Sequence, residues 1–219
     1  SGEEIHVKEY MGARYDCEIL VENNVIADLK GQYLDLSGTN RNLVYLYISD
    51  GVGGSIICNG QVIDGENSMA GKFAHILVES GGRRCACGKR GHLESYVSKP
   101  AMEEAYFEAS GKRLELPEIC RLAGEGEKAA AAVLKDAIDK LAIGINQILL
   151  VVNPGTLVLY GDLFESVDGI LERLKQKTKE LAFTEEIADN CWMVRETKNV
   201  RIEDSIARLS VERALEIIV

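Results

Sequence analysis

The sequence predicts an α/β fold, because short segments of strand composition alternate with longer segments of helical periodicity. Residues 43–48 and 157–160 are rich in Val, Leu, Ile and Tyr, as buried strands are. Residues 98–109 and 127–150 instead place apolar side chains every three or four positions, which is typical of helices packed on a core. We expect one layered α/β architecture without internal repeats or long linkers.

Polar residues follow the first predicted strand. Residues 7–15 predict a short helix and residues 17–21 a buried strand, after which comes the triplet Glu22-Asn23-Asn24. Open α/β sheets place ligand-binding groups at such strand ends. A plain strand-to-helix turn is an equally good interpretation of the triplet alone.

A glycine-dense hairpin follows the strand at residues 43–48. It reads Ser49-Asp50-Gly51-Val52-Gly53-Gly54, strand character resumes at residues 55–58, and Asn59-Gly60 then predicts a tight turn. Because glycine has no Cβ, backbone N–H groups there can approach an anion such as a phosphate. A purely structural turn is the commoner reason for such a sequence.

The second half of the chain continues the alternation. Asn153-Pro154-Gly155 ends the long helix, and after the strand at 157–160 the pair Gly161-Asp162 predicts the start of a helix that runs to about Leu181. A strand at residues 192–195 and an amphipathic helix over about 203–218 complete the predicted elements.

Composition restricts the class of protein. A formal net charge of −10 argues against nucleic-acid binding by this chain alone, since neutralising phosphates requires clustered Lys and Arg. No run reaches the ~18 apolar residues of a membrane-spanning helix, and the start resembles no signal peptide. We therefore expect a cytoplasmic protein with reduced thiols and no membrane partner. The opening Ser1-Gly2 before a charged stretch suggests that sequence upstream is missing.

Two of the three histidines flank the single Cys-x-Cys of the chain, in the order His75, Cys85, Cys87, His92. Two thiolates and two imidazoles are the ligands that zinc prefers in a tetrahedral site. Because the protein fills all four positions, the spacing predicts one structural zinc ion rather than a catalytic one. Buried cysteines beside unrelated histidines and a redox-active thiol pair are the alternatives.

The segments 70–75 (Ala-Gly-Lys-Phe-Ala-His) and 85–94 (Cys-Ala-Cys-Gly-Lys-Arg-Gly-His-Leu-Glu) resemble the zinc segment of the ROK family, which combines sugar-responsive transcriptional repressors with sugar kinases. Residues 21–24, 49–54 and 154–163 fall in the order of that family. The resemblance covers nearly the whole chain.

The resemblance implies an actin-like, ribonuclease-H-like fold of two α/β lobes, with the first lobe mostly missing here. On this basis residues 1–20 are a remnant of the first lobe, residues 21–200 the C-terminal lobe with its zinc loop at 70–94, and residues 201–219 a C-terminal helix. A phosphate loop and a DNA-binding winged helix would lie upstream. The resemblance also implies a homodimer, and DNA binding only through the missing winged helix.

Two departures from the family concern the sugar site. Asn24 stands where the kinases of the family have an Asp that accepts the proton of the attacking sugar hydroxyl, and an amide cannot act as that base. Lys72 stands where a Glu usually accepts hydrogen bonds from sugar hydroxyls, so a carboxylated or phosphorylated sugar would suit it better. A solvated surface lysine is an equally good interpretation of Lys72.

Two further departures concern the nucleotide site. Tyr160 replaces a glycine that borders the adenine pocket, and Asp50 brings a negative charge to the turn that we interpret as a remnant of phosphate binding, with Gly51, Gly53 and Gly54. ATP is therefore not an expected cofactor. The sugar contacts implied by the resemblance are Asn23, Asn24, Lys72, His75 and Glu94, although Glu94 could instead cap the following helix.

Three functions remain open at this stage. The first is the sugar-sensing effector domain of a ROK-type transcriptional regulator without kinase activity, which needs a pocket and a zinc loop but no proton acceptor. The second is an ATP-dependent sugar kinase, and the third is a degenerate scaffold that binds neither sugar nor nucleotide. We favour the regulator.

Overall fold

A five-stranded mixed sheet organises the part of the chain that the computed structural model describes, namely residues 6–19, 21, 27, 42–189, 191–195, 203–204, 206–207 and 210–211. Its strands are β1 (Leu43–Ile48), β2 (Val52–Cys58), β3 (Gln61–Val62), β4 (Thr156–Tyr160) and β5 (Cys191–Arg195). The order across the sheet is β3-β2-β1-β4-β5. Strand β1 is antiparallel to β2 and parallel to β4, and β4 is parallel to β5. The carboxyl ends of β1, β4 and β5 therefore lie at one edge of the sheet.

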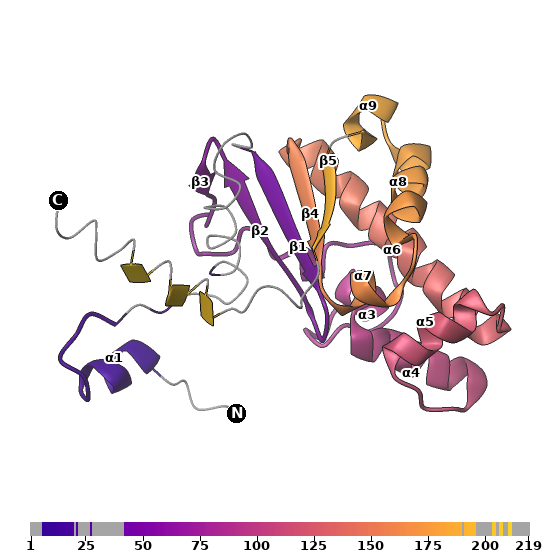
Figure 1. The fold of residues 1–219 in the computed structure, drawn as a ribbon, viewed down its shortest axis with the longest axis horizontal. Helices are drawn as coiled ribbons and strands as arrows, with labels where there is room; N and C mark the ends of the chain where they lie inside the picture. Colours follow the sequence, from indigo (N-terminus) through magenta and orange to yellow (C-terminus); the bar gives the residue numbers. More distant parts are fainter. Residues whose placement is uncertain are drawn as a thin grey trace.

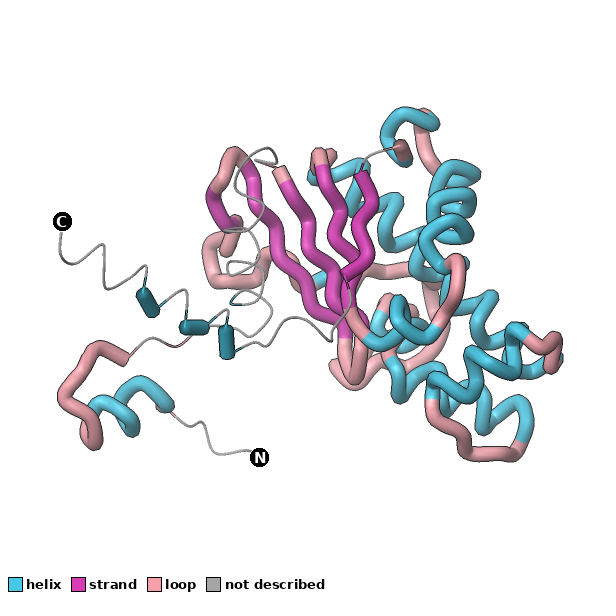
Figure 2. Tube along the Cα trace, in the orientation of Figure 1, coloured by secondary structure: helices cyan, strands magenta, loops and turns pink. Residues whose placement is uncertain are grey.

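Helices cover one face of this sheet, as Figure 1 shows. They are the short 3-10 turn η1 (Phe73–His75) and the helices α3 (Glu94–Val97), α4 (Lys99–Ser110), α5 (Leu116–Gly124), α6 (Lys128–Val152), α7 (Asp162–Ser166), α8 (Ile170–Leu181) and α9 (Glu185–Ala188). Helix α1 (Val7–Gly12) buries none of its residues and lies apart from the sheet. Figure 2 shows the same view coloured by secondary structure. The long helix α6 contacts α3, α4, α5, α8 and α9, so the helical layer is built around it.

Side-chain alternation along the strands separates two apolar clusters. Val44, Leu46 and Ile48 of β1 join the large core beneath the helices, whereas Leu43 and Tyr45 point to the opposite face. This follows from the two-residue period of a strand. Strand β4 repeats the pattern and is buried along its whole length, as expected of a central strand in an α/β sheet.

The ends of α6 explain its length of 25 residues. At its start the carboxylate of Glu127 accepts a hydrogen bond from the N–H of Ala130 at 2.7 Å, which satisfies a free donor of the first turn. At its end Asn153 takes the left-handed conformation with φ of 45°, and Pro154 follows. Eleven buried residues lie between these ends, so the face that the sequence predicts is the face that packs.

Most predicted elements are confirmed, including the hairpin turn at Asn59-Gly60, where both residues have positive φ. Two predictions are wrong, and one helix was missed. The described residues of segment 17–21 lie in no strand, because a short apolar run becomes a strand only where a neighbour pairs with it. The single helix expected from Gly161 to Leu181 is two helices, since Gly169 adopts φ of 65° between them. Helix α5 was not predicted.

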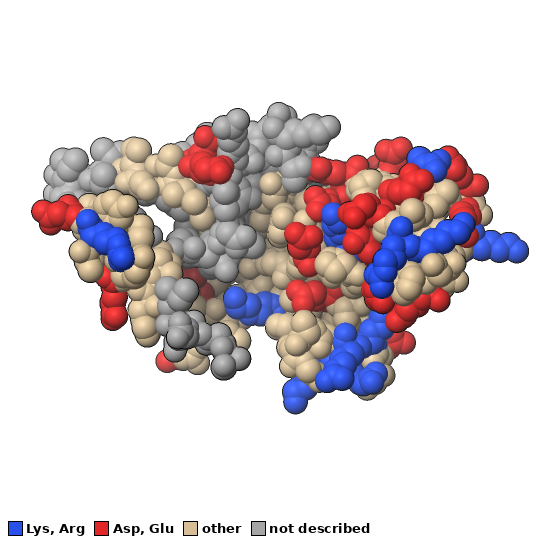
Figure 3. All heavy atoms as spheres, turned by 90° about the horizontal axis from the view of Figure 1, so that it is seen from below, with Lys and Arg blue, Asp and Glu red and all other residues tan. Residues whose placement is uncertain are grey.

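Some predictions fall on residues outside the described part. The triplet 22–24, and with it the two candidate sugar contacts Asn23 and Asn24, lies there. Of the predicted C-terminal helix, the described residues between 203 and 211 are helical. Within the described residues no helix combines the length and apolarity required to span a bilayer. Figure 3 shows many Asp and Glu side chains over the helical part, consistent with the net charge of −10.

Candidate metal centre and ligand edge

The four predicted metal ligands come together in one cluster. One donor atom from each of His75, Cys85, Cys87 and His92 lies within 4.8 Å of the other three. The His75 Nδ1 to Cys85 Sγ distance is 4.0 Å, and the His92 Nδ1 to Cys87 Sγ distance is 3.2 Å. A tetrahedral zinc ion with bonds of about 2.0–2.3 Å holds its ligands roughly 3.3–3.8 Å apart. The two pairs lie just outside this range on either side, and the chemistry of the four donors, two thiols and two imidazoles, fits zinc.

The loop between these ligands, residues 75–92, is hereafter the metal loop. Its tip is a tight turn in which the N–H of Cys85 bonds the carbonyl of Lys89 at 2.9 Å, and the N–H of Gly88 bonds the carbonyl of Cys85 at 2.9 Å. The cysteines belong to this tip, whereas the histidines lie at the base, where His92 pairs with Leu77. A metal ion would therefore join the tip of the loop to its base.

Charge and burial differ among the four ligands. Cys85 is buried, His92 is half-buried, and His75 and Cys87 are exposed. Burial raises the pKa of the Cys85 thiol, a hydrogen bond with the backbone of Cys87 partly offsets this rise, and the Cys87 side chain and the Glu94 charge add to it. A bound divalent cation favours the thiolate and would oppose this rise. The cluster is therefore better suited to a metal than to a free reactive thiolate.

The base of the metal loop requires glycine at position 91. Gly91 has φ of 79°, and a Cβ there would lie 1.6 Å from the carbonyl oxygen of Glu79. The close approach permits the N–H groups of Val78 and Glu79 to bond the carbonyl of Gly91 at 2.8 and 3.2 Å. In contrast, Gly88 has φ of 87° but open space around it. Only the first of these glycines is fixed by packing as well as by conformation.

The metal loop lies along one stripe of α6. Arg83 Nη2 pairs with Asp136 Oδ2 at 2.8 Å, and Gln147 Nε2 donates to the carbonyl of Leu77 at 3.2 Å. Between these contacts, a Cβ on Gly144 would lie 3.1 Å from Leu93 Cδ2, so the chain after the loop packs closely on the helix. Helix positions separated by three or four residues share a face. The long helix is therefore the platform for the loop.

Two residues that flank the metal loop contact the glycine turn, residues 49–54. The ring of Phe73 packs on Gly54, where a Cβ would lie 2.2 Å from Phe73 Cδ2. Glu94, the first residue of α3, accepts a hydrogen bond from the N–H of Val52 at 3.2 Å. The N-cap residue of α3 is Leu93, which makes no side-chain cap bond, and Glu94 is the acidic residue of the first turn. Both contacts hold the loop and the turn together.

The predicted sugar and phosphate residues differ in their exposure and in the contacts they make. Lys72 and His75, which lie close to Phe73 in the sequence, are exposed. Glu94 and Gly51, where the metal loop meets the glycine turn, are half-buried. Gly54 serves a packing role, and Gly53 pairs with Tyr47 in the hairpin. Asp50 is exposed at the tip of the turn. The structure thus brings Lys72, His75 and Glu94 to the glycine turn, while Asn23 and Asn24 lie outside the described residues.

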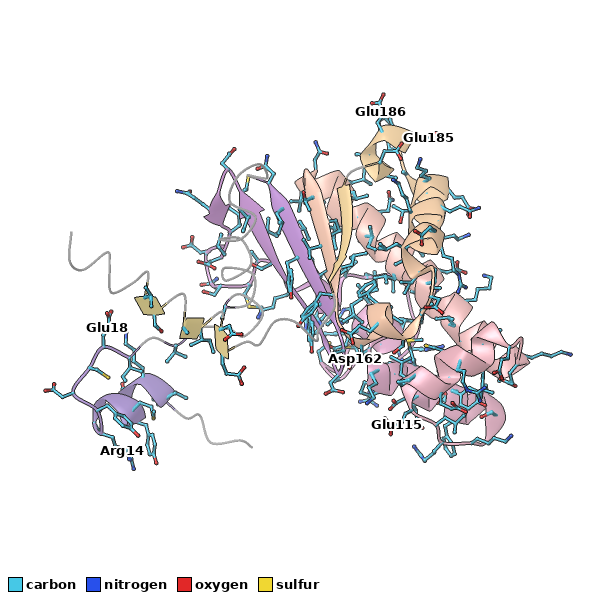
Figure 4. All side chains as sticks on the ribbon, in the orientation of Figure 1. Arg14, Glu18, Glu115, Asp162, Glu185 and Glu186 are labelled. Atoms are coloured by element: carbon cyan, nitrogen blue, oxygen red, sulfur yellow. The ribbon has the colours of Figure 1, made fainter. Side chains whose placement is uncertain are left out.

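The sheet edge next to this turn carries a contact that sequence reasoning missed. The hydroxyl of Ser49, after β1, donates to the carboxylate of Asp162, after β4. Gly161 permits it, because its φ is 113° and a Cβ would lie 2.2 Å from the carbonyl oxygen of Ile48. Figure 4 labels Asp162 where the strands end and α7 begins. Parallel neighbouring strands ending in polar residues were the available signal.

Tyr160, the last residue of β4, lies at the same edge. Its ring centroid is 5.3 Å from that of Tyr47 and 5.7 Å from that of Tyr45, and its side chain is 9% exposed. Three tyrosines therefore pack together on the face opposite the helices.

A separate hollow of about 540 Å³ lies between α4 and α5, and none of its lining residues belongs to the candidate site.

Comparison with known proteins finds a matching family and several relatives. The model of a family described as the ROK family matches residues 1–201. The xylose repressor of Bacillus subtilis is 25% identical over 83% of this chain and 47% of its own length. The N-acetyl-D-glucosamine kinase of Shigella boydii is 30% identical, over 70% of this chain and 54% of its own length. The chain therefore spans about half the length of these relatives.

Solved structures share the fold. A ROK hexokinase from Thermus thermophilus superposes with a TM-score of 0.80 at 21% identity, covering 94% of this chain and 70% of that one. A ROK family transcriptional regulator, described as a homologue of the E. coli MLC protein, gives a TM-score of 0.75 at 20% identity, covering 91% and 53%. At these identities the likeness concerns the fold alone.

Proposed function

Because the chain belongs to the ROK family, we propose that it forms the sugar-sensing effector part of a ROK-type transcriptional regulator without kinase activity. The observation that carries the proposal is an asparagine at position 24, which the resemblance to the family aligns with the proton-accepting Asp of its kinases. Loss of a general base costs about 10²–10⁴-fold in rate. Sensing requires only that a ligand bind one conformation more tightly than another, and it needs no base.

The nucleotide edge supports the same proposal. Asp162 and Asp50 add negative charge at the ends of β1 and β4, near the place where phosphates of a nucleotide would lie. Without a bound cation, carboxylates repel phosphate oxygens. Tyr160 fills the space beside Tyr47 that a glycine at its position would leave open. ATP is therefore not part of the proposed function.

A structural zinc ion belongs to the proposal. His75, Cys85, Cys87 and His92 would hold it, and their two thiolates and two imidazoles complete a tetrahedron without a position for water. Such an ion supplies folding free energy rather than chemistry. The ion would hold His75 in place directly. It would also hold Glu94, which follows His92 by two positions and bonds the N–H of Val52. Both residues are candidate sugar contacts.

The remaining parts of the proposal follow from family membership. The chain would be one α/β lobe of an actin-like fold that works as a homodimer, with DNA bound by a winged helix elsewhere in the protein. Its ligand would be a sugar or sugar derivative. Lys72, exposed beside His75, suits a carboxylated or phosphorylated sugar better than a neutral hexose.

A sugar kinase is the second candidate, favoured by two relatives named as kinases. The Shigella boydii enzyme is 30% identical, and the glucokinase of Pyrobaculum calidifontis is 33% identical over 66% of this chain. A coupled assay for ADP release with hexoses and amino sugars separates the candidates. We expect no turnover above background, and none after Asn24→Asp. Phosphorylation of any sugar by the unmodified protein would refute the regulator proposal.

Ligand class is a separate measurement. Thermal-shift titration with glucose, N-acetylglucosamine, a uronic acid and a hexose 6-phosphate should stabilise the protein with the acidic sugars. Lys72→Glu should reverse that preference, because the cation becomes an acceptor of the opposite charge. A shift with neutral sugars only would exclude the acidic ligand, and no shift with any sugar would favour a scaffold that binds none.

A further inference from the structure

The metal ligands are carried by three chain segments that cross at one buried side chain. Glu79 lies four positions after His75, Cys85 lies two positions after Arg83, and Tyr96 lies four positions after His92. Tyr96 is 2% exposed and lies in α3. Its hydroxyl donates to Glu79 Oε2 at 2.7 Å and accepts the N–H of Arg83 at 2.7 Å.

The crossing is tight and charged. A Cβ on Gly82 would lie 2.0 Å from the Tyr96 hydroxyl oxygen, so the chain passes directly over it. Lys140 of α6 pairs with Glu79 Oε2 at 3.0 Å, and its Nζ lies 5.3 Å from the Tyr96 ring centroid. The Arg83 guanidinium lies 4.9 Å from the same centroid. Two cations and two hydrogen bonds thus converge on one aromatic side chain.

We infer that Tyr96 is a positioning residue of the metal site, whose hydroxyl fixes the three ligand-bearing segments before the metal binds. Tyr96 touches no ligand atom in this arrangement. It acts through Glu79, which sets the segment from His75, and through the backbone of Arg83, which sets the approach to Cys85. This inference rests on the zinc site of the proposed function.

The physical consequence is a metal-free loop that keeps its base. The bonds at Glu79, Arg83 and Gly91 and the pair Arg83–Asp136 involve no metal ligand side chain. When the ion leaves, the tip, residues 85–90, would lose the tie through Cys85 and Cys87 and keep the hydrogen bond from Arg90 Nη1 to the carbonyl of Gly82 at 3.0 Å. Preorganisation of this kind raises affinity, because less chain has to be ordered on binding. Removing an outer partner of a metal site typically lowers metal affinity 10–100-fold.

Tyr96→Phe tests the inference, because it keeps the buried ring and removes both hydrogen bonds. Competition with a chromophoric zinc chelator should show a roughly tenfold weaker zinc affinity. The matched control is Tyr106→Phe, since Tyr106 is also 2% exposed and its hydroxyl takes part in no described bond to the metal loop. The control should bind zinc as the unmodified protein does.

Hydrogen exchange of the metal-free proteins gives a readout that a merely structural role would not move in the same way. In the unmodified protein, the amides of residues 79–84 should stay protected while 85–90 exchange faster. In Tyr96→Phe, protection of 79–84 should fall and that of α6 should remain. An unchanged zinc affinity, or a loss of protection spread evenly over α6, would overturn the inference. Failure of the unmodified protein to bind zinc would instead overturn the metal site itself.

Discussion

At the scale of single residues, the metal loop is shaped by glycine as much as by its ligands. Gly91 brings the carbonyl of Glu79 within the space of a methyl group, and Gly82 does the same for the Tyr96 hydroxyl. The structure shows that these glycines permit the close approach of the chain segments that carry the ligands. Such approaches depend on neighbours distant in sequence, so spacing alone does not reveal them.

Gly91→Ala should lower the free energy of unfolding by about 3 kcal/mol or more, because a Cβ would lie 1.6 Å from a backbone oxygen that cannot move aside. Gly88→Ala is the matched control, with a positive φ but open space, and should cost about 1 kcal/mol. Urea unfolding of both variants in excess chelator measures the difference. Equal losses would contradict the role given to the approach at Gly91.

At the scale of elements, sequence predicted strands and long helices well and short helices poorly. Strands β1 and β4 were found because both are continuous apolar runs, and α6 because its apolar stripe repeats over seven turns. Helix α5 was missed even though Pro117 marks its first turn, since its nine residues span only about two and a half turns. The break between α7 and α8 depends on one left-handed glycine, whose conformation only the packed structure decides.

The contact between the metal loop and α6 should weaken in acid. Hydrogen bonding from Tyr96, followed by that from Lys140, lowers the pKa of Glu79. A carboxyl whose folded pKa is lowered stabilises the fold above its unfolded pKa of about 4.3, and this contribution is lost as the pH falls through the folded value.

The stability difference between the unmodified protein and Glu79→Gln should therefore be constant near neutral pH and shrink below about pH 4. Urea unfolding of both metal-free proteins between pH 6 and 3 measures it, since excess chelator removes the pH dependence of metal binding. A difference that grew in acid would have the wrong sign for the Glu79 ion pair.

At the scale of the whole molecule, the resemblance to the ROK family inferred from residues 70–94 is confirmed by the family match over residues 1–201. Part of the candidate site was also predictable. Its four candidate ligands are histidines and cysteines, which are uncommon in the chain, and their spacing is recognisable. The contact of Ser49 with Asp162 was not predictable, since the two residues are 113 positions apart. The hydrogen bonds of the Tyr96 hydroxyl with Glu79 and Arg83 were not predictable either, because Tyr96 is interpreted from the sequence as a core residue.

Metal removal should loosen the molecule locally. The main apolar core includes residues of β1, β4, α4, α5, α6 and α8, and its buried members include only Val78 from the metal loop, so most of the core does not depend on the loop. Excess chelator should lower the thermal midpoint by roughly 5 °C, which corresponds to about 1–2 kcal/mol for a chain of this size, with little change in far-ultraviolet circular dichroism. Cys85→Ser should give the same midpoint without chelator. Loss of most helical signal would contradict a locally acting metal.

The stripe that α6 offers to the metal loop consists of Asp136, Lys140, Gly144 and Gln147. Their intervals follow the turn of the helix, and each added residue rotates what comes after it by about 100°. Insertion of one residue between positions 136 and 147 would therefore rotate about half of these contact residues away from the loop. Substitutions along this stretch remove one contact at a time, whereas a change in its length misaligns several together.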